Sequence, residues 1–331
     1  MAGENSVARS KLTTERDAIA RFVEDGDTIY CGFSMGPMGL AHEVIRQKKR
    51  RLNAVGASNV VTAGLLAVAG CSDRMETGYV SDALGNGPVN EMMQDGRLRF
   101  EDYSNLVIAL RFMAGALGMP FIPGNSFLGT DYLKPEVMNH SHSLKAERTR
   151  ADGTVAPSYV VMDSPFVDGG KTVLYPALKP DVALFHCQRA DEFGNTQAWG
   201  PLADSKWALW ASRKVIISAE EIVAPSVIRS DPGRTVIPGF RVSAVVHNPW
   251  GVHPGPMYGM YAHDRTFSSL VRQPFRSWEG AREYLDEWVY GVEDRAGYVR
   301  HYAERFGDQL LESLRLKDLI VPEQPAVGGW R

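Results

Sequence analysis

The chain has 331 residues and a formal net charge of −3, and 44% of its residues are hydrophobic and 23% charged. This balance is typical of a folded globular protein and argues against nucleic acid as a partner. The polar start has no apolar signal core, and no run approaches the ~18 consecutive apolar residues of a membrane helix, so we expect a cytoplasmic protein without membrane contact.

Short strands and helices alternate through the first third of the chain. Thr13 or Thr14 is a suitable cap for an opening helix. Apolar runs and helical spacing then predict strands at 28–31, 59–62 and 77–80, and helices at 40–49, 64–69, 88–94 and 104–117. Such alternation predicts an α/β fold with an open, mostly parallel sheet and helices on both faces.

The middle of the chain is different in character. Residues 134–170 are polar and rich in turn formers, and we interpret them as a long excursion from the fold. Regular elements resume with strands at 172–175, 182–185, 215–217 and 242–246, a helix at 203–212, and helices from 278 to 316. We therefore predict an N-terminal tail (1–11), one domain (12–316) and a C-terminal tail (317–331).

The three cysteines are Cys31, Cys71 and Cys187. Their wide spacing and odd number predict reduced thiols, because neither a disulfide framework nor a CxxC zinc motif is present. His140 and His142 form an HxH pair without further ligands at suitable spacing, so we interpret them as solvated loop residues and predict no metal site.

The glycine-rich loop from Gly32 to Gly39 follows a predicted strand and precedes a predicted helix. Such a loop either brings backbone amides close to an anionic ligand or simply makes a tight turn. Its glycine spacing is not that of a dinucleotide-binding motif, and Pro37 removes one amide donor. His186 follows an apolar strand and is either a ligand-crevice residue or a hydrogen-bonded core residue.

Two acidic pairs are candidates: Glu220–Glu221 follows the predicted strand 215–217, and Glu101–Asp102 comes just before the helix predicted from residue 104. Carboxylates at these positions are suited either to catalysis or to the positive end of a following helix, and we favour capping or solvation. The tryptophans, including Trp199, are interpreted as core or interface residues. No nucleophile elbow with a Ser/His/Asp order is present.

Several motifs in order resemble the α subunit of family I CoA-transferases, of the glutaconate CoA-transferase type. The resemblance spans about residues 12 to 300 and is carried by 25–29 with Gly32–Phe33, then 101–105, 114–123, 128–131, 181–188, 191–200, 217–222, 228–232, 237–239 and 253–261. It implies an open α/β fold of the CoA-transferase type and a homologous β-type partner in a heterotetramer. It further implies acyl-CoA and carboxylates as small-molecule partners, with coenzyme A as a substrate and product rather than a bound cofactor.

The resemblance implies that the nucleophilic glutamate lies on the β subunit, in a Glu-Asn-Gly-like motif. The only Glu-Asn pair of this chain is Glu4–Asn5 in the polar tail, followed by Ser6. A tail cannot hold a nucleophile in the required geometry. We therefore expect this chain to complete an active site without supplying its nucleophile and to be inactive alone.

The resemblance and the strand-end positions together predict the substrate-binding residues. Gly32, Phe33 and Ser34 are expected beside the partner's glutamate, and His186 and Gln188 are further candidates. Asn105, Gly129 and Thr130 are expected to orient the acyl group by hydrogen bonds. The loop departs from the family pattern in two places. This chain has Cys31-Gly32-Phe33 where the family has Gly-Gly-Phe, and the part of the loop after Phe33 is altered around Pro37.

Two alternatives remain open. The chain also resembles the two-subunit CoA-thioester hydrolases that open steroid ring fragments, in which we expect a glutamate near the position of Asn105. An asparagine cannot act as a base, so this substitution favours transfer over hydrolysis. The other alternative is a non-catalytic acyl-CoA-binding scaffold.

Overall fold

The structure is a computed structural model that describes residues 9–33, 36–58, 60–79, 87–134 and 157–316. The predicted HxH pair at 140 and 142 and most of both predicted tails lie outside these residues. The division of the chain into one domain and two tails stays a prediction.

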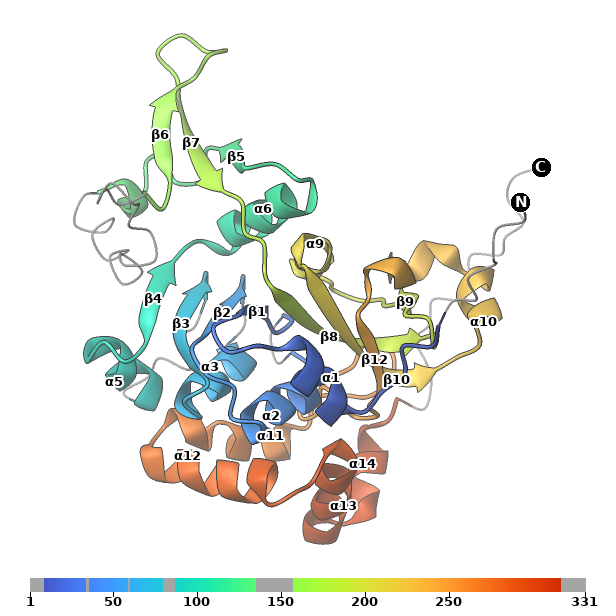
Figure 1. Cartoon of the computed structure of the whole chain (residues 1–331). Coiled ribbons are helices and arrows are strands. Elements are labelled where there is room, and N and C mark those ends of the chain that lie inside the picture. Colours follow the sequence, from blue (N-terminus) through green and yellow to red (C-terminus); the bar gives the residue numbers. More distant parts are fainter. Residues whose placement is uncertain (1–8, 34–35, 59, 80–86, 135–156, 317–331) are drawn as a thin grey trace, which may run out of the picture.

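A parallel sheet forms the centre of the molecule, with the strand order β12-β10-β8-β1-β2-β3-β4 (Figure 1). Two short strands, β9 and β11, extend it antiparallel from the end of β8. The parallel strands are β1 (Thr28–Tyr30), β2 (Leu52–Gly56), β3 (Ser72–Thr77), β4 (Arg99–Asp102), β8 (Val182–Ala190), β10 (Lys214–Ile222) and β12 (Ala244–His247), and the extension is β9 (Thr196–Gln197) and β11 (Thr235–Ile237).

Alternate residues of the inner strands enter two separate hydrophobic cores, one on each face of the sheet, and β8 shows this most fully. On β8, Val182 and Leu184 belong to the first core, whereas Ala183 and Phe185 belong to the second. This is the two-residue period of a strand that is buried on both faces. The predicted class, α/β with an open, mostly parallel sheet, is therefore confirmed.

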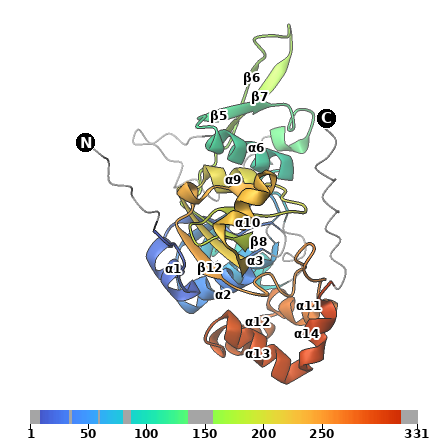
Figure 2. The same cartoon turned by 90° about the vertical axis from the view of Figure 1, so that its right-hand side faces the viewer.

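The helices lie on both sides of this sheet. Both views place α6 and α9 on one side and α12 to α14 on the other (Figures 1 and 2). The α-helices described before residue 265 are α1 (Glu15–Phe22), α2 (Met38–Arg46), α3 (Val60–Val68), α5 (Pro88–Gln94), α6 (Asn105–Ala116), α9 (Ser205–Ala211) and α10 (Pro225–Ser230).

The C-terminal part of the described chain is helical, as predicted. It contains α11 (Arg265–Val271), α12 (Trp278–Leu285), a π-helical turn η6 (Asp286–Tyr290), α13 (Arg295–Phe306) and α14 (Asp308–Leu314). Buried aromatic rings pack these helices against one another, and Trp288 of η6 stands edge-on against Phe267 of α11 with ring centroids 4.6 Å apart. Within the described residues, no helix has the length and apolar character needed to cross a membrane.

A second, antiparallel sheet has the order β5-β7-β6, formed by β5 (Phe121–Gly124), β6 (Val160–Asp163) and β7 (Lys171–Pro176). Its β6–β7 hairpin projects away from the body (Figure 1). Strand β6 falls inside the predicted excursion, so this part of the excursion is regular structure. Its side chains are all exposed, which explains why no burial pattern indicated a strand.

Two predicted strands were misplaced. Residues 60–62 begin helix α3, and the strand of this region is β2, which comes just before that helix along the chain. The second, predicted at 77–80, is β3, which ends at Thr77. A short buried apolar run does not distinguish strand from helix, and only the pairing of β2 with β1 and β3 decides which segment enters the sheet.

Candidate active site

A cavity of about 300 Å³ opens at the carboxyl ends of β1 and β8, the usual position of ligand sites in parallel sheets. Its walls come from the β1–α2 loop, from β8, from the segment between β9 and α9, and from the loop after β12. The lining residues are Gly32, Phe33, Gly36, Pro37, Phe185, His186, Gln188, Ala198, Trp199, Pro201, Leu202, Ser205, Val252, Pro256, Met257 and Tyr258.

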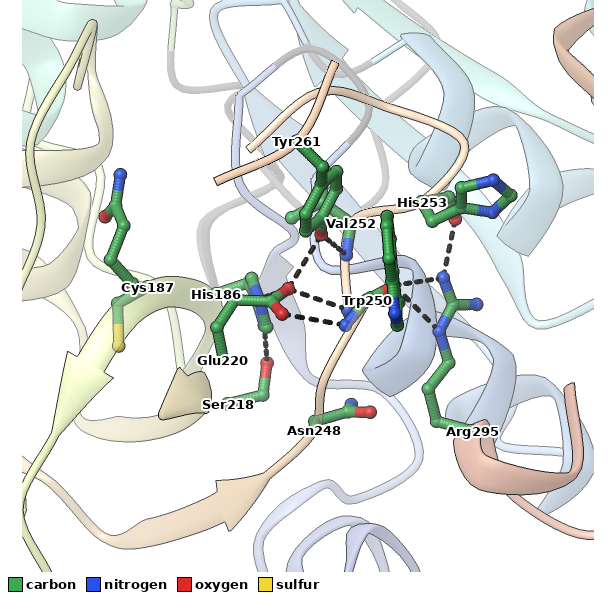
Figure 3. Close-up of polar contacts among 12 residues, drawn as sticks. His186, Cys187, Ser218, Glu220, Asn248, Trp250, Val252, His253, Tyr261 and Arg295 are labelled. Carbon is green, nitrogen blue, oxygen red and sulfur yellow. Dashed lines mark hydrogen bonds and ion pairs between the residues drawn. The ribbon is translucent and has the colours of Figure 1, made fainter. Parts of the chain in front are cut away.

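His186 lies on β8 directly opposite Ser218 of β10. Its Nδ1 is 2.8 Å from the Ser218 hydroxyl, and its Nε2 is 2.8 Å from Oε1 of Glu220 (Figure 3). An ionised carboxylate only accepts hydrogen bonds, so Nε2 carries the proton and, in the neutral ring, Nδ1 accepts from the hydroxyl. Both ring nitrogens are therefore committed to protein partners.

Glu220 belongs to β10, and its side chain is buried against the loop that follows β12. Besides His186, the Tyr261 hydroxyl donates to Oε1 at 2.7 Å, and the Trp250 and Gly251 amides donate to the carboxylate at 2.9 and 3.2 Å. Burial alone would raise the pKa of Glu220, but the hydrogen bonds from His186, Trp250 and Tyr261 hold it below its ordinary value. Glu220 thus joins β8 and β10 to the loop that supplies one wall of the cavity.

Gln188 makes a second connection of this kind. Its amide nitrogen donates to the carbonyl oxygens of Trp199 and Tyr258 at 2.9 and 3.0 Å, and its oxygen accepts from the Trp199 amide at 3.3 Å. The side chain is 2% exposed. Gln188 therefore fixes two cavity walls to β8.

The glycine-rich loop reaches the cavity through Gly32 and Phe33, whereas Ser34 lies outside the described residues. Gly36 has a φ of +62°, and a Cβ atom there would lie 2.1 Å from the carbonyl oxygen of Cys31. This position therefore requires glycine. The loop reverses directly into α2, whose first residue is Met38.

The predicted site residues within the described chain separate into two groups. Gly32, Phe33, His186 and Gln188 line the cavity, whereas Asn105, Gly129 and Thr130 do not. The second group gathers near the carboxyl end of β4. Asn105 opens α6 three residues after that strand, and the turn after Thr130 is attached to it by a hydrogen bond from Tyr132 to Asp102 at 3.2 Å.

The interpretation of the acidic pairs as caps or solvated residues was wrong for one residue of each pair, Glu101 and Glu220, which are buried, whereas Asp102 and Glu221 are exposed. Glu101 and Asp102 belong to β4, and the cap of α6 is Ser104, which accepts from the Val107 amide. Glu220 is a buried member of β10 rather than a helix cap or a solvated residue. Its alternation with Ser218, two residues earlier on the same face, was the available signal, but the strand was predicted to end at residue 217.

Sequence reasoning also missed Tyr261, the Trp250 amide and the role of Trp199 in the cavity wall. These groups meet through the loop after β12, and no local pattern indicates that contact. All three cysteines are buried and free, in agreement with the prediction. Within the described part of the chain, no cluster of three or more His, Cys, Asp or Glu residues is suited to a metal ion.

Residues 13–248 match a family described as Coenzyme A transferase. The chain belongs to this family. It is 30% identical over 300 residues to the α subunit of glutaconate CoA-transferase from Acidaminococcus fermentans, an alignment that covers 88% of this chain and 91% of the relative. It is 29% identical over 303 residues to the α subunit of 3-oxoadipate CoA-transferase from Pseudomonas knackmussii, with 89% and 99% covered.

The fold agrees with these relationships. The crystal structure of glutaconate coenzyme A-transferase from Acidaminococcus fermentans matches with a TM-score of 0.81 and 29% identity, covering 93% of this chain and 96% of that chain. This chain is therefore a CoA-transferase subunit, homologous to the α subunits of heteromeric enzymes. The relationship to two such α subunits implies a β-type partner.

Proposed function

We propose that this chain is the α subunit of an acyl-CoA:carboxylate CoA-transferase and that the nucleophilic glutamate lies on its β-type partner. One observation carries the second half of this proposal. Among the described residues, no carboxylate lines the cavity. The carboxylate of Glu220 lies behind His186 and accepts hydrogen bonds from four donors. A carboxylate held in this way is not free to attack a thioester.

The proposed chemistry proceeds through the partner's carboxylate. Its oxygen attacks the thioester carbonyl, the C–S bond breaks, and CoA leaves as a thiolate with an acyl-glutamyl anhydride behind it. The thiolate then attacks the glutamyl carbonyl, which releases the acyl group as a carboxylate and leaves a glutamyl-CoA thioester. An acceptor carboxylate reverses both steps.

This chain contributes the binding surface in that scheme. Gly32 and Phe33 line the cavity, and we propose that Ser34 joins them beside the partner's glutamate. His186 and Gln188 hold the walls in place. Asn105, Gly129 and Thr130 are proposed to contact a part of the substrate that extends toward the end of β4.

The assembly is proposed to be α2β2 and cytoplasmic. The buried, reduced cysteines support a reducing compartment, because disulfides form in oxidising ones. Coenzyme A is proposed to act only as substrate and product, with no permanently bound cofactor.

Borohydride trapping tests this function. The full chain is purified with its β-type partner, incubated with an acyl-CoA, and reduced, and each chain is then mapped by mass spectrometry. We expect a reduced glutamyl residue on the partner and none on this chain. Transfer by this chain alone would overturn the proposal, and release of free CoA and free acid without an acceptor would indicate a hydrolase instead.

A further inference from the structure

Four residues of the cavity lining are exposed and therefore lie at its mouth. All four are apolar or aromatic, and they come from three separate segments: the β1–α2 loop, the segment between β9 and α9, and the loop after β12. A single exposed apolar residue is ordinary, but a group of them gathered around one opening marks a surface that contacts another molecule. We call this group the rim, and its members are Phe33, Pro201, Pro256 and Tyr258.

Tyr258 is the more exposed of the two aromatic residues of the rim, at 52% against 37% for Phe33. It lies on a tight turn whose ends are joined twice. The Met257 amide donates to the Tyr261 carbonyl oxygen, and the Tyr261 amide donates to the Met257 carbonyl oxygen, both at 3.0 Å. The side-chain amide of Gln188 donates to the Tyr258 carbonyl oxygen at 3.0 Å, so the turn is also attached to β8.

The side chain of Tyr258 has a support of its own. A Cβ atom at Gly200 would lie 2.8 Å from both Cβ and Cγ of Tyr258, so the tyrosine packs directly on the backbone of this glycine. Gly200 has a φ of +94°, a conformation that other residues rarely adopt. The pyrrolidine rings of Pro201 and Pro256 restrict the backbone at two further points of the rim. A rim held in this way loses little conformational entropy when another molecule covers it.

The position of the rim indicates which molecule covers it. The proposed nucleophile belongs to the β-type partner and has to reach a thioester bound in the cavity. The chain that carries this carboxylate therefore approaches the mouth of the cavity, where the rim lies. The centre of a protein–protein interface is enriched in aromatic residues and depleted in charged ones, and the rim has this composition.

We propose that the rim is a contact surface for the β-type partner and that Tyr258 is its main anchor. The inference rests on the proposed transferase function and adds the residues through which the partner binds. A rigid tyrosine presents a large apolar area at low entropic cost, and such residues often dominate the binding energy of an interface. The partner is expected to cover Tyr258 with an apolar surface of its own.

Dilution of the assembled complex tests this surface. The full chain is co-purified with its β-type partner, and mass photometry without substrate measures the fraction of intact complex over a range of concentrations. This gives a Kd for the two chains. Tyr258→Ala should raise this Kd by at least ~10-fold, the effect expected for an interface anchor. An unchanged Kd overturns the proposal.

A second variant and a control accompany this measurement. Pro201→Asp places a charge on a different segment of the rim and should also raise the Kd by at least ~10-fold, because the carboxylate loses its hydration in the contact. It decides the outcome if Tyr258→Ala does not fold. The control is Tyr290→Ala, which truncates a 44% exposed tyrosine of η6 outside the cavity lining and should leave the Kd unchanged. Equal weakening in the control would show that the effect is not specific to the rim and would contradict the proposal.

Substrate binding to the rim is the competing explanation, and kinetics distinguish the two. If Tyr258→Ala raises the KM for acyl-CoA but leaves the Kd of the two chains unchanged, the rim contacts the substrate and the proposal is wrong.

The contact surface and the transferase function fail in different ways. If Tyr258→Ala weakens the complex but the unmodified complex transfers no CoA, the contact surface stands and the transferase function fails. If the unmodified complex transfers CoA and both rim variants assemble as tightly as it does, the transferase function stands and the contact surface is wrong.

Discussion

Nε2 of His186 on β8 donates to Oε1 of Glu220 on β10 at 2.8 Å, and Glu220 in turn connects these two neighbouring strands to the loop after β12, which forms one wall of the cavity. The same carboxylate accepts from the Tyr261 hydroxyl and from two amides of that loop. Four donors therefore surround this buried charge, which is the condition under which such a charge stabilises a fold rather than weakening it.

Glu220→Gln should disturb both stability and the cavity. The amide brings two hydrogens to a position where four donors already point, so at least one donor loses its partner. We expect a loss of about 2 to 4 kcal/mol in the free energy of unfolding, measured by urea denaturation. We also expect a lower kcat/KM in the complex, with KM affected more than kcat, because the cavity wall moves while the proposed nucleophile does not.

The neighbouring residue provides the control for this variant. Glu221 is exposed on the same strand, and Glu221→Gln should change the free energy of unfolding by less than about 0.5 kcal/mol. Similar losses in both variants would contradict the assigned role of Glu220.

Gly36→Ala should distort the β1–α2 loop. Its φ of +62° is unfavourable for alanine, and the added Cβ would lie 2.1 Å from the Cys31 carbonyl oxygen. We expect a loss of more than about 2 kcal/mol in the free energy of unfolding, since strain and a backbone clash act together. Circular dichroism during thermal melting measures the shift.

Gly26→Ala separates strain from the clash. Gly26 has a φ of +91°, but its Cβ position is empty within 4 Å. This variant should lose only about 1 kcal/mol. Equal losses in the free energy of unfolding for the two variants would mean that the close approach of Gly36 to Cys31 does not limit stability.

Much of the fold could be predicted from the sequence because its signals are local. Thr14 caps α1, Pro88 opens α5, and the stretch predicted as helix 104–117 is α6 almost residue for residue. The strand β2 could not be found in this way, since its identity depends on pairing with neighbours on both sides rather than on its own residues.

The site was predictable in part for the same reason. His186 and Gln188 were named from the family resemblance together with a strand predicted to end at residue 185. The strand β8 runs on to Ala190, and both side chains alternate on it and line the cavity. Glu220 was assigned to a cap because its strand was predicted too short, and Tyr261 reaches it across 41 positions of sequence. Contacts between residues so far apart in the sequence produce no periodic pattern from which they could be predicted.

Asn105→Ala and Thr130→Val test the second group of predicted residues. Both side chains are exposed, so Asn105→Ala should leave the melting temperature unchanged, and Thr130→Val should lower it only slightly, because the Thr130 hydroxyl donates to the Phe127 carbonyl oxygen at 2.8 Å. If they hydrogen-bond the substrate, each should lower kcat/KM by roughly tenfold, which corresponds to the loss of one hydrogen bond. Leu106→Ala, which alters the exposed neighbour of Asn105, is the control and should retain full activity.

His253→Gln should change how stability depends on pH. His253 is fully buried, with Nδ1 2.8 Å from the Tyr298 hydroxyl and Nε2 3.1 Å from Asp264. Burial lowers the pKa of His253 to about 4, although the hydrogen bond to Asp264 acts in the opposite direction. The folded chain therefore keeps this imidazole neutral where the unfolded chain protonates it.

The sign of the effect comes from proton counting. Between the ordinary histidine pKa of 6.5 and the folded value of about 4, the unfolded state binds more protons, so stability falls as the pH decreases through this window. The contribution from this residue amounts to roughly 3 kcal/mol over the window, and it disappears when the residue cannot titrate. Urea denaturation of both proteins at several pH values between about 4 and 7 should thus show a steeper loss in the unmodified chain than in His253→Gln. Parallel curves would mean that His253 is protonated in the folded state and pairs with Asp264 as an ion.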